Sequence, residues 1–412
     1  MQAIAPPSAS TQAIAAEIRA RVSGKFEHFY AARGYQPLWA ASGHIGPEAD
    51  TLLGFLGSAD LDGLNPSNVD SLRKAIDQAQ SGDPRAVANA ELKLSKAYAR
   101  YVDAMRRIRK PTMTYVDEQL LPKKLTPEMA LGAAGLVPSF PDYIASMGWM
   151  SPHYVRIRDL MARAQRLDNP PDVVKRLRLN LDRARELPSP WTHHVVVDAA
   201  SGRLWFYQGG KEFGTMKVVV GKAASPTPML AGMLRYAILN PYWNVPVDLA
   251  QNLIAPKILS GRTLASMNME ALSDWSAAPQ KLKPAAINWT AVASGAQQLR
   301  LRQLPGGSNA MGRVKFLFPN DLGIYLHDTP EKDLLAKEDR HFSNGCIRLD
   351  NAPSLGKWLL GKPVSTKGVS AETAVSIPLP VPVYLTYLTP VSTDQGVGFL
   401  NDVYGRDASA SQ

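Results

Sequence analysis

Two side chains in the C-terminal half have the chemistry of a nucleophile and its base. Cys346 is the only cysteine of the 412 residues, so the chain can form no internal disulfide. A lone cysteine is more often a small buried apolar residue, and its neighbours must decide its role. His327 follows an apolar stretch, where a strand end can hold an imidazole facing a cleft. An imidazole can take the thiol proton and stabilise the thiolate as an ion pair, which predicts that Cys346 acts as a nucleophile with His327 as its base.

The residues around the cysteine fit the same chemistry. Ser343, Asn344 and Gly345 precede it, and Gly345 lets a substrate approach the backbone closely. The backbone N–H groups of Gly345 and Cys346 are predicted to stabilise a tetrahedral oxyanion. Arg348 lies two residues beyond the nucleophile, so on a strand both side chains project from one face. We expect Arg348 to pair with a substrate carboxylate or to support the site.

Three aromatic residues are candidates for contact with a substrate. Tyr242 and Trp243 lie in NPYWNVP, just before a long insertion, and Tyr325 lies two residues before His327. The alternative for each is ordinary core packing, because aromatic side chains in strands usually pack against neighbours. We predict no metal or other cofactor, since adjacent histidines on a strand point to opposite faces and no second cysteine exists.

The first half of the chain, residues 1–190, is predicted to be a helical scaffold. Apolar residues recur at helical spacing over 48–56, and 86–108 contains good helix formers without internal Gly or Pro. The end of the second segment is basic, which suits a helix C-terminus, and Pro111 stops it. A further long helical stretch is predicted from 152 to 186.

After Pro190 the pattern changes to strands. β-branched and aromatic runs separated by Gly-containing turns predict a hairpin meander. Residues 191–407 are therefore predicted to form a β-rich catalytic domain, which gives the chain an α+β fold. Residues 248–293 are too long for a plain loop, and we interpret them as an inserted helical subdomain laid over the site. Residues 408–412 are a polar tail.

Composition restricts the function only broadly. The chain carries a net charge of +10, which favours anionic partners such as nucleic acid, lipid headgroups or wall polymers, or simply solubility. No nucleic-acid-binding motif is present, and no apolar run approaches the roughly 18 residues of a membrane helix. No signal peptide is visible at the start, so a targeting or anchoring segment is expected to lie outside this sequence.

Taken together, the sequence resembles the L,D-transpeptidases with a YkuD-type catalytic domain, and most closely their large, YcbB-like Gram-negative branch. The family signature is a His, a gap of about 15 residues, then Ser/Thr-His-Gly-Cys, an aliphatic residue and Arg. Here 15 residues separate His327 from Ser343. Further similar stretches cover nearly the whole chain: HFYAARGYQPLW (28–39), NLDRAR (180–185), NPYWNVP (240–246), PGGSNAMGRVKFLFPN (305–320), PVYLTYLT (382–389) and DVYGRD (402–407).

The resemblance implies a periplasmic enzyme that joins peptidoglycan stem peptides. Cys346 would attack the third residue of a tetrapeptide donor, and an amine of a second stem would resolve the thioester into a 3→3 crosslink. The family orients its His through a backbone carbonyl, which falls here on Asp328. Carbapenems are the inhibitors that the resemblance implies.

Two departures from the family pattern stand out. Asn344 replaces the usual His before Gly-Cys, which removes a second imidazole from the site. A peptidoglycan-binding module of about 70 residues, common in relatives, is not found between 111 and 190. Docking to the wall would then depend on another surface, such as the basic one.

Three alternatives stay open from the sequence. Water as acceptor would make an L,D-carboxypeptidase, and a protein amine as acceptor would attach outer-membrane proteins to the wall. A non-catalytic wall-binding scaffold with a relic site is the third.

Overall fold

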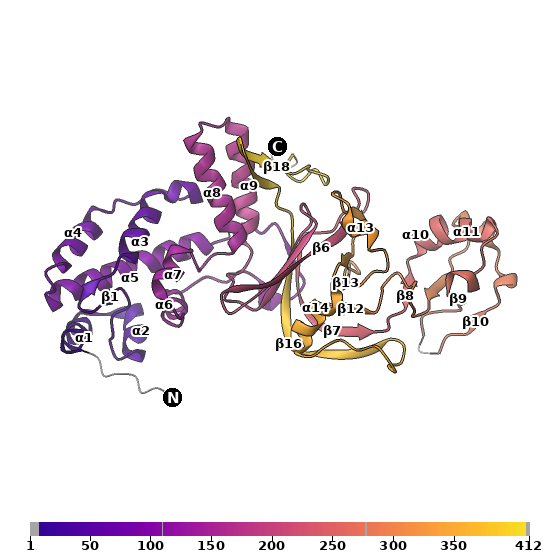
Figure 1. Ribbon diagram of the computed structural model, residues 1–412, viewed down its shortest axis with the longest axis horizontal. Coiled ribbons are helices and arrows are strands. Elements are labelled where there is room, and N and C mark those ends of the chain that lie inside the picture. The colour runs from indigo at the N-terminus through magenta and orange to yellow at the C-terminus, as the bar shows by residue number, and fades with distance from the viewer. Residues whose placement is uncertain (1–7, 109, 277, 409–412) are drawn as a thin grey trace.

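The computed structural model describes residues 8–108, 110–276 and 278–408, and its N-terminal half is helical as predicted (Figure 1). The long helix α5 (Pro84–Arg106) lies at the centre and packs against α1, α4 and α6. Asp83 caps its first turn by accepting from the Ala86 N–H at 2.9 Å, with Pro84 at the first helical position. The other helices of this half are α1 (Ala9–Arg21), α2 (Glu27–Ala32), α3 (Glu48–Gly57), α4 (Asp70–Ala79), α6 (Pro127–Gly135), α7 (Phe140–Ala145), α8 (Pro152–Arg166) and α9 (Pro171–Arg185).

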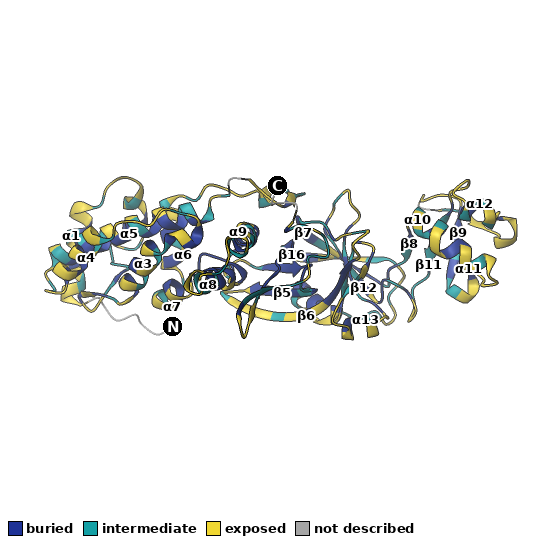
Figure 2. Cartoon of the chain, turned by 90° about the horizontal axis from the view of Figure 1, so that it is seen from above, coloured by how far each residue is buried: buried dark blue, intermediate teal, exposed yellow. Residues whose placement is uncertain are grey.

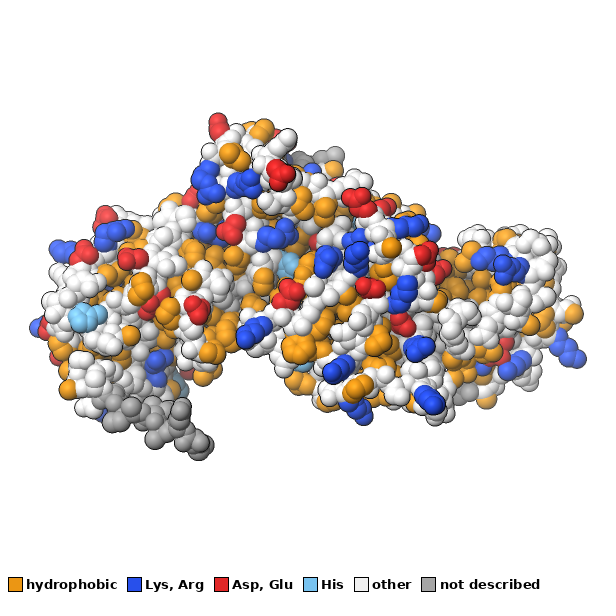
Figure 3. All heavy atoms as spheres, in the orientation of Figure 1, with side chains coloured by type: hydrophobic (Ala, Val, Ile, Leu, Met, Phe, Trp, Pro, Cys, Tyr) orange, Lys and Arg blue, Asp and Glu red, His pale blue; other side chains and the backbone are white. Residues whose placement is uncertain are grey.

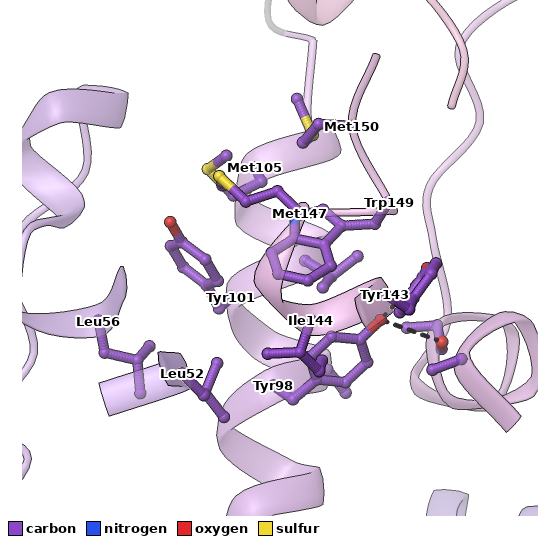
Figure 4. Packing of buried hydrophobic residues seen from close by; sticks show 14 of the residues in the cluster. Leu52, Leu56, Tyr98, Tyr101, Met105, Tyr143, Ile144, Met147, Trp149 and Met150 are labelled. Carbon is purple, nitrogen blue, oxygen red and sulfur yellow. Dashed lines mark hydrogen bonds between the residues drawn. The ribbon is translucent and has the colours of Figure 1, made fainter. Parts of the chain in front are cut away.

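Aromatic, aliphatic and methionine side chains pack together in the core of this helical part (Figure 4). The Trp149 ring packs edge-on against Tyr98 and Tyr143, with centroid distances of 5.5 and 6.0 Å. A fully buried carboxylate, Glu91, accepts from the Tyr30 hydroxyl at 2.6 Å and from two backbone N–H groups. A buried charge is tolerated only when it is hydrogen-bonded in this way, so Glu91 fixes the loop before α3 against α5.

The prediction of one long helical stretch over 152–186 is wrong in one respect, because the structure has two helices there. α8 ends at Arg166 and α9 begins at Pro171. Between them Asp168 adopts a positive φ of 49°, and the pair Pro170-Pro171 cannot continue a helix. The two helices lie side by side, upright between the helical half and the sheet (Figure 1).

The C-terminal half is built on one large mixed sheet. The predicted meander is present as β4 (His194–Asp198), β5 (Arg203–Gln208) and β6 (Lys211–Gly221), paired antiparallel. The neighbour order is β12-β13-β15-β6-β5-β4-β16-β7-β3, and a further β12–β7 pairing closes the sheet on itself around an apolar core. The remaining bounds are β7 (Leu230–Leu239), β12 (Val314–Leu317), β13 (Leu326–His327), β14 (His341–Ser343), β15 (Ile347–Leu349), β16 (Thr373–Thr386), α13 (Asp333–Ala336) and α14 (Ala352–Leu360).

Segments from both ends of the chain attach the helical half to this sheet. The short strand β3 (Thr114–Tyr115) pairs parallel with β7, so residues within the predicted scaffold extend the catalytic sheet. The C-terminal hairpin β17 (Pro390–Thr393) and β18 (Gly396–Phe399) packs against α8. Asp407 accepts from Arg183 on α9 at 2.6 Å, an ion pair with both side chains buried. The predicted tail from residue 409 onward lies outside the described residues.

The inserted subdomain projects from the far end of the sheet, at the right of Figures 1 and 2. The expectation that it is helical is incomplete, because it also contains an antiparallel sheet of order β10-β9-β11-β8 with its own apolar core. β9 has the sequence MEAL, whose residues favour helix, so pairing with β11 overrides local propensity. Its elements are β8 (Trp243–Val245), α10 (Val247–Leu249), a π-helical turn (Ala250–Ile254), α11 (Ala255–Leu259), β9 (Met269–Leu272), β10 (Lys281–Leu282), α12 (Trp289–Ala293) and β11 (Arg300–Gln303).

Candidate active site

Two parallel strands bring the imidazole of His327 and the thiol of Cys346 to the same side of the sheet. β13 and β15 pair with Leu326 opposite Ile347 and His327 opposite Arg348. Leu326, just before His327, and Ile347, just after Cys346, are fully buried in the core of the sheet. Since side chains alternate along a strand, His327, Arg348 and Cys346 project from the other face, on strands about 4.8 Å apart.

These side chains line a cavity of about 600 Å³ between the sheet and the insert. The sheet side of the cavity contributes Tyr325, His327, Cys346 and Arg348 among others. The insert contributes the opposite wall, partly from the π-helical turn that ends at Ile254. Figure 3 shows the surface hollowed where the insert meets the sheet. The thiol is therefore at the bottom of a cleft with two walls from different parts of the chain.

The imidazole of His327 is held in one tautomer. Its Nδ1 lies 2.6 Å from the Asp328 carbonyl oxygen, and because a carbonyl only accepts, Nδ1 must carry the proton. Nε2 is left with its lone pair available to accept a proton. Burial lowers the pKa of His327 to about 3, against the opposing effect of this hydrogen bond. The ring is therefore neutral at pH 7 and can act as a base.

The thiol of Cys346 is also neutral at rest. Burial raises its pKa from 9.0 to about 11, although hydrogen bonds from the backbone and side chain of Tyr325 and the charge of Arg348 act in the opposite direction. The thiol donates weakly to the Gly323 carbonyl oxygen at 3.5 Å. Burial therefore disfavours the resting thiolate–imidazolium pair that the sequence suggested, because low-dielectric surroundings raise the free energy of both charged forms.

The nucleophile loop is held from behind by hydrogen bonds. The Ser343 hydroxyl donates to the Cys346 carbonyl at 2.6 Å and accepts from the Gly345 N–H at 3.1 Å. The Gly345 N–H is therefore occupied, which contradicts its predicted role as an oxyanion donor. None of the hydrogen bonds found among the described residues uses the Cys346 N–H, so that group is available.

Gly345 is required for its conformation. Its φ of 109° lies in the region that favours glycine, and a Cβ there would meet Ile324 Cδ1 at 3.2 Å. The buried Thr227 hydroxyl donates to the Gly345 carbonyl at 2.8 Å and accepts from the Gly221 N–H at 2.9 Å. The sequence analysis missed Thr227, because no local pattern links it to a loop more than a hundred residues away.

The predicted substrate residues separate into two groups. Tyr325, Trp243, Asn344 and Ser343 line the cavity, although the Ser343 hydroxyl is committed to the loop itself. Tyr242 is not among the lining residues, which contradicts its predicted role as a substrate wall. Its ring lies under the Arg302 guanidinium at 4.3 Å, whereas Trp243, the first residue of β8, lines the cavity.

Arg348 lines the cavity but is already paired. Its guanidinium forms an ion pair with the Glu331 carboxylate, which also lines the cavity and is largely exposed. Arg348 is therefore not free to meet a substrate carboxylate unless Glu331 moves away. Within the described residues, no group of three or more His, Cys, Asp or Glu side chains could hold a metal ion.

Comparisons with known proteins match the two halves of the chain separately. Residues 24–161 match a family model described as a Scaffold domain, and residues 192–367 match one described as an L,D-transpeptidase catalytic domain, YkuD. A putative L,D-transpeptidase from Haemophilus influenzae is 28% identical over 243 residues, covering 57% of this chain and 49% of that protein. The match thus spans about half the length of this curated relative.

The solved structures that match this chain have low sequence identity to it and low TM-scores. An L,D-transpeptidase from Mycobacterium smegmatis is 14% identical, with a TM-score of 0.23 over 47% of this chain and 58% of that one. An LD transpeptidase in complex with imipenem is 13% identical, with a TM-score of 0.23 and the same shares covered. TM-scores this low give no support for a shared arrangement.

Proposed function

Since this chain belongs to the L,D-transpeptidases, with a YkuD catalytic domain behind a Scaffold domain, we propose that it forms 3→3 crosslinks between peptidoglycan stem peptides through a thioester on Cys346. The observation that carries the proposal is that His327 ends β13 and Cys346 immediately precedes β15, the strand paired parallel to it. Cys346 and His327 face one cleft, and the Asp328 carbonyl leaves Nε2 of the imidazole free to accept a proton.

The first half-reaction loads the donor onto the thiol. As Sγ of Cys346 attacks the carbonyl carbon of the third donor residue, a diamino acid, His327 Nε2 takes the thiol proton. The tetrahedral oxyanion accepts a hydrogen bond from the Cys346 N–H, worth about 2.7–4 kcal/mol in comparable sites. The C–N bond to the terminal D-amino acid then breaks, and His327 returns the proton to the departing amine.

The second half-reaction transfers the acyl group. The side-chain amine of a second stem attacks the thioester carbonyl, and His327 accepts one of its protons. The C–S bond breaks, and the proton passes to the sulfur to restore the thiol. Two half-reactions through a covalent intermediate predict ping-pong kinetics.

Incubation of the purified protein with tetrapeptide muropeptides, followed by mass spectrometry, tests this proposal. We expect crosslinked dimers and the released D-amino acid, and neither from Cys346→Ala. Tripeptide as sole product would replace transpeptidation with L,D-carboxypeptidase activity. Dimers formed equally by Cys346→Ala would refute the nucleophile.

Inhibition and acceptor range give further tests. Intact mass after exposure to meropenem should show an adduct on the wild type that is absent from Cys346→Ala. A lysine-containing peptide from an outer-membrane protein, offered together with tetrapeptide donor, would become attached if protein amines are acceptors.

The proposed substrate places the enzyme in the periplasm. None of the helices in the described residues is long and apolar enough to cross a membrane. Peptidoglycan stem peptides would be met outside the cytoplasmic membrane, and fractionation of cells followed by detection of the chain tests this location.

A further inference from the structure

The cleft has an excess of positive charge, and part of that charge comes from the insert. Two cationic side chains, Lys257 and Arg262, line the cavity from the insert, opposite Cys346. The carboxylate among the lining residues is Glu331, which is already paired with Arg348. Two positive charges of the cleft therefore remain without a carboxylate partner among the described residues.

One helix end carries both cations, Lys257 within α11 and Arg262 three residues after its last residue. α11 ends in a turn in which the Arg262 N–H donates to the Lys257 carbonyl at 3.0 Å and the Gly261 N–H donates to the Ile258 carbonyl at 3.0 Å. Gly261 has a φ of 97°, the left-handed conformation that such helix C-terminal motifs use. The Ser260 hydroxyl also donates to the Lys257 carbonyl, at 2.9 Å. The backbone that carries both side chains is thus fixed before any ligand arrives.

Neither cationic side chain is paired with another group among the described residues of the insert. Both residues are exposed, and no hydrogen bond or ion pair of either side chain occurs within the described residues. Other charges of the insert are used differently, since Lys281 and Arg302 both pair with Glu270. Residues 243–303 contain six Lys or Arg and three Asp or Glu residues, and lysine and arginine side chains are visible on the insert in Figure 3.

We infer that Lys257 and Arg262 form a carboxylate-binding site on the insert, which positions the peptide donor over Cys346. This inference rests on the proposed function. A tetrapeptide donor carries the carboxylate of its terminal residue and, when the third residue is diaminopimelate, a second one on that side chain. Guanidinium and ammonium groups bind carboxylates by charge-assisted hydrogen bonds, and an excess of one charge in a cleft also raises the local concentration of its counter-ion.

The role inferred for Lys257 and Arg262 differs from the one that the sequence suggested for Arg348. That residue is neutralised by Glu331 and lies on β15, two residues after Cys346. The insert cations approach from the opposite wall, so a peptide bound to them would span the cleft across the thiol. The insert then acts as part of the substrate site and contributes directly to specificity.

Alkylation of Cys346 by two small reagents of different charge tests the inference directly. Iodoacetate is anionic and iodoacetamide is neutral, and both form the same C–S bond with loss of iodide. The ratio of their rates, measured by intact mass, reports the electrostatic potential at the sulfur and cancels differences in thiol pKa. We expect Lys257→Gln combined with Arg262→Gln to lower this ratio by about tenfold, and each single change by about threefold.

Lys283→Gln is the matched control, because it removes one positive charge from the insert at an exposed residue that does not line the cavity. The ratio should stay at the wild-type value in this variant. Added salt of about 1 M should shrink the difference between wild type and double variant, since it shortens the Debye length to about 3 Å. An equal ratio in wild type and double variant would overturn the inference, as would an equal loss in Lys283→Gln.

Kinetics with tetrapeptide donor complete the test. The double variant should raise KM by about tenfold with kcat little changed, because the lost contacts lie away from the reacting atoms. A fall in kcat at constant KM would contradict the inference. Should no tetrapeptide turnover exist even in the wild type, the proposed function fails, while the alkylation ratio still decides whether the cations act on anions at the thiol.

Discussion

Replacing His327 with Gln tests whether its imidazole accepts a proton during attack or keeps the thiol ionised at rest. Burial raises the pKa of Cys346 to about 11 and lowers the pKa of His327 to about 3. At pH 7 the thiolate fraction is then about one in ten thousand, compared with about one in a hundred for a thiol of pKa 9. The imidazole is essentially all neutral, so it adds almost nothing to the stability of a thiolate at rest.

Two opposite expectations follow for His327→Gln. Alkylation by iodoacetamide, which consumes the small resting thiolate population, should keep its wild-type rate at pH 7 within about twofold and continue to rise with pH toward 11. Acylation by a tetrapeptide donor should fall by about 10²–10⁴, because the proton must then leave without a positioned base. The variant thus separates thiol ionisation from general base catalysis.

The assay is intact mass over time, with iodoacetamide between pH 6 and 11 and with meropenem or tetrapeptide at pH 7. His28→Gln, exposed on α2, is the control for loss of an imidazole elsewhere and should change neither rate. A tenfold or larger drop in alkylation of His327→Gln at neutral pH would refute the reasoning, because it would mean that an ion pair exists at rest. An unchanged acylation rate would equally refute it.

Three further changes have expected outcomes. Glu331→Gln releases Arg348, and the KM for tetrapeptide donor should fall about two- to fivefold in initial-rate measurements. Thr227→Val leaves the Gly345 carbonyl without its buried donor, which should cost about 1–3 kcal/mol in urea denaturation and slow acylation, while Thr227→Ser restores both. Burial lowers the pKa of His194 from 6.5 to about 4, so the unfolded state takes up the proton first on acidification. The stability that a neutral His194 provides is fully present above pH 6.5 and lost between pH 6.5 and 4, so urea midpoints should fall in this window and fall less in His194→Gln.

Each of these outcomes has a clear contrary result. An unchanged or higher KM in Glu331→Gln would mean that the carboxylate does not compete with the substrate. Wild-type acylation in Thr227→Val would show that the loop does not need that hydroxyl. An identical pH dependence in His194→Gln would assign the acid sensitivity to other buried groups.

Part of the site could be predicted because its residues are close in sequence. Cys346 and its neighbours form one contiguous motif, and His327 with Asp328 ends the strand next to it. The neutral protonation states could not be predicted, because they depend on how deeply the fold buries both groups. The role of the Gly345 N–H was wrong for a related reason, since Ser343 folds back onto it only in the assembled loop.

Periodicity and a compact motif depend on covalent neighbours, so the sequence was enough to predict a helical half followed by a β-rich half and to propose Cys346 as the nucleophile. What faces that thiol depends on the assembled fold. Lys257 and Arg262 lie far from Cys346 along the chain and reach its cleft only because β8 and β11 anchor the insert there. Tyr242 lies beside Trp243 in sequence, yet its ring packs under Arg302 while Trp243 lines the cleft, and these contacts form only in the folded insert.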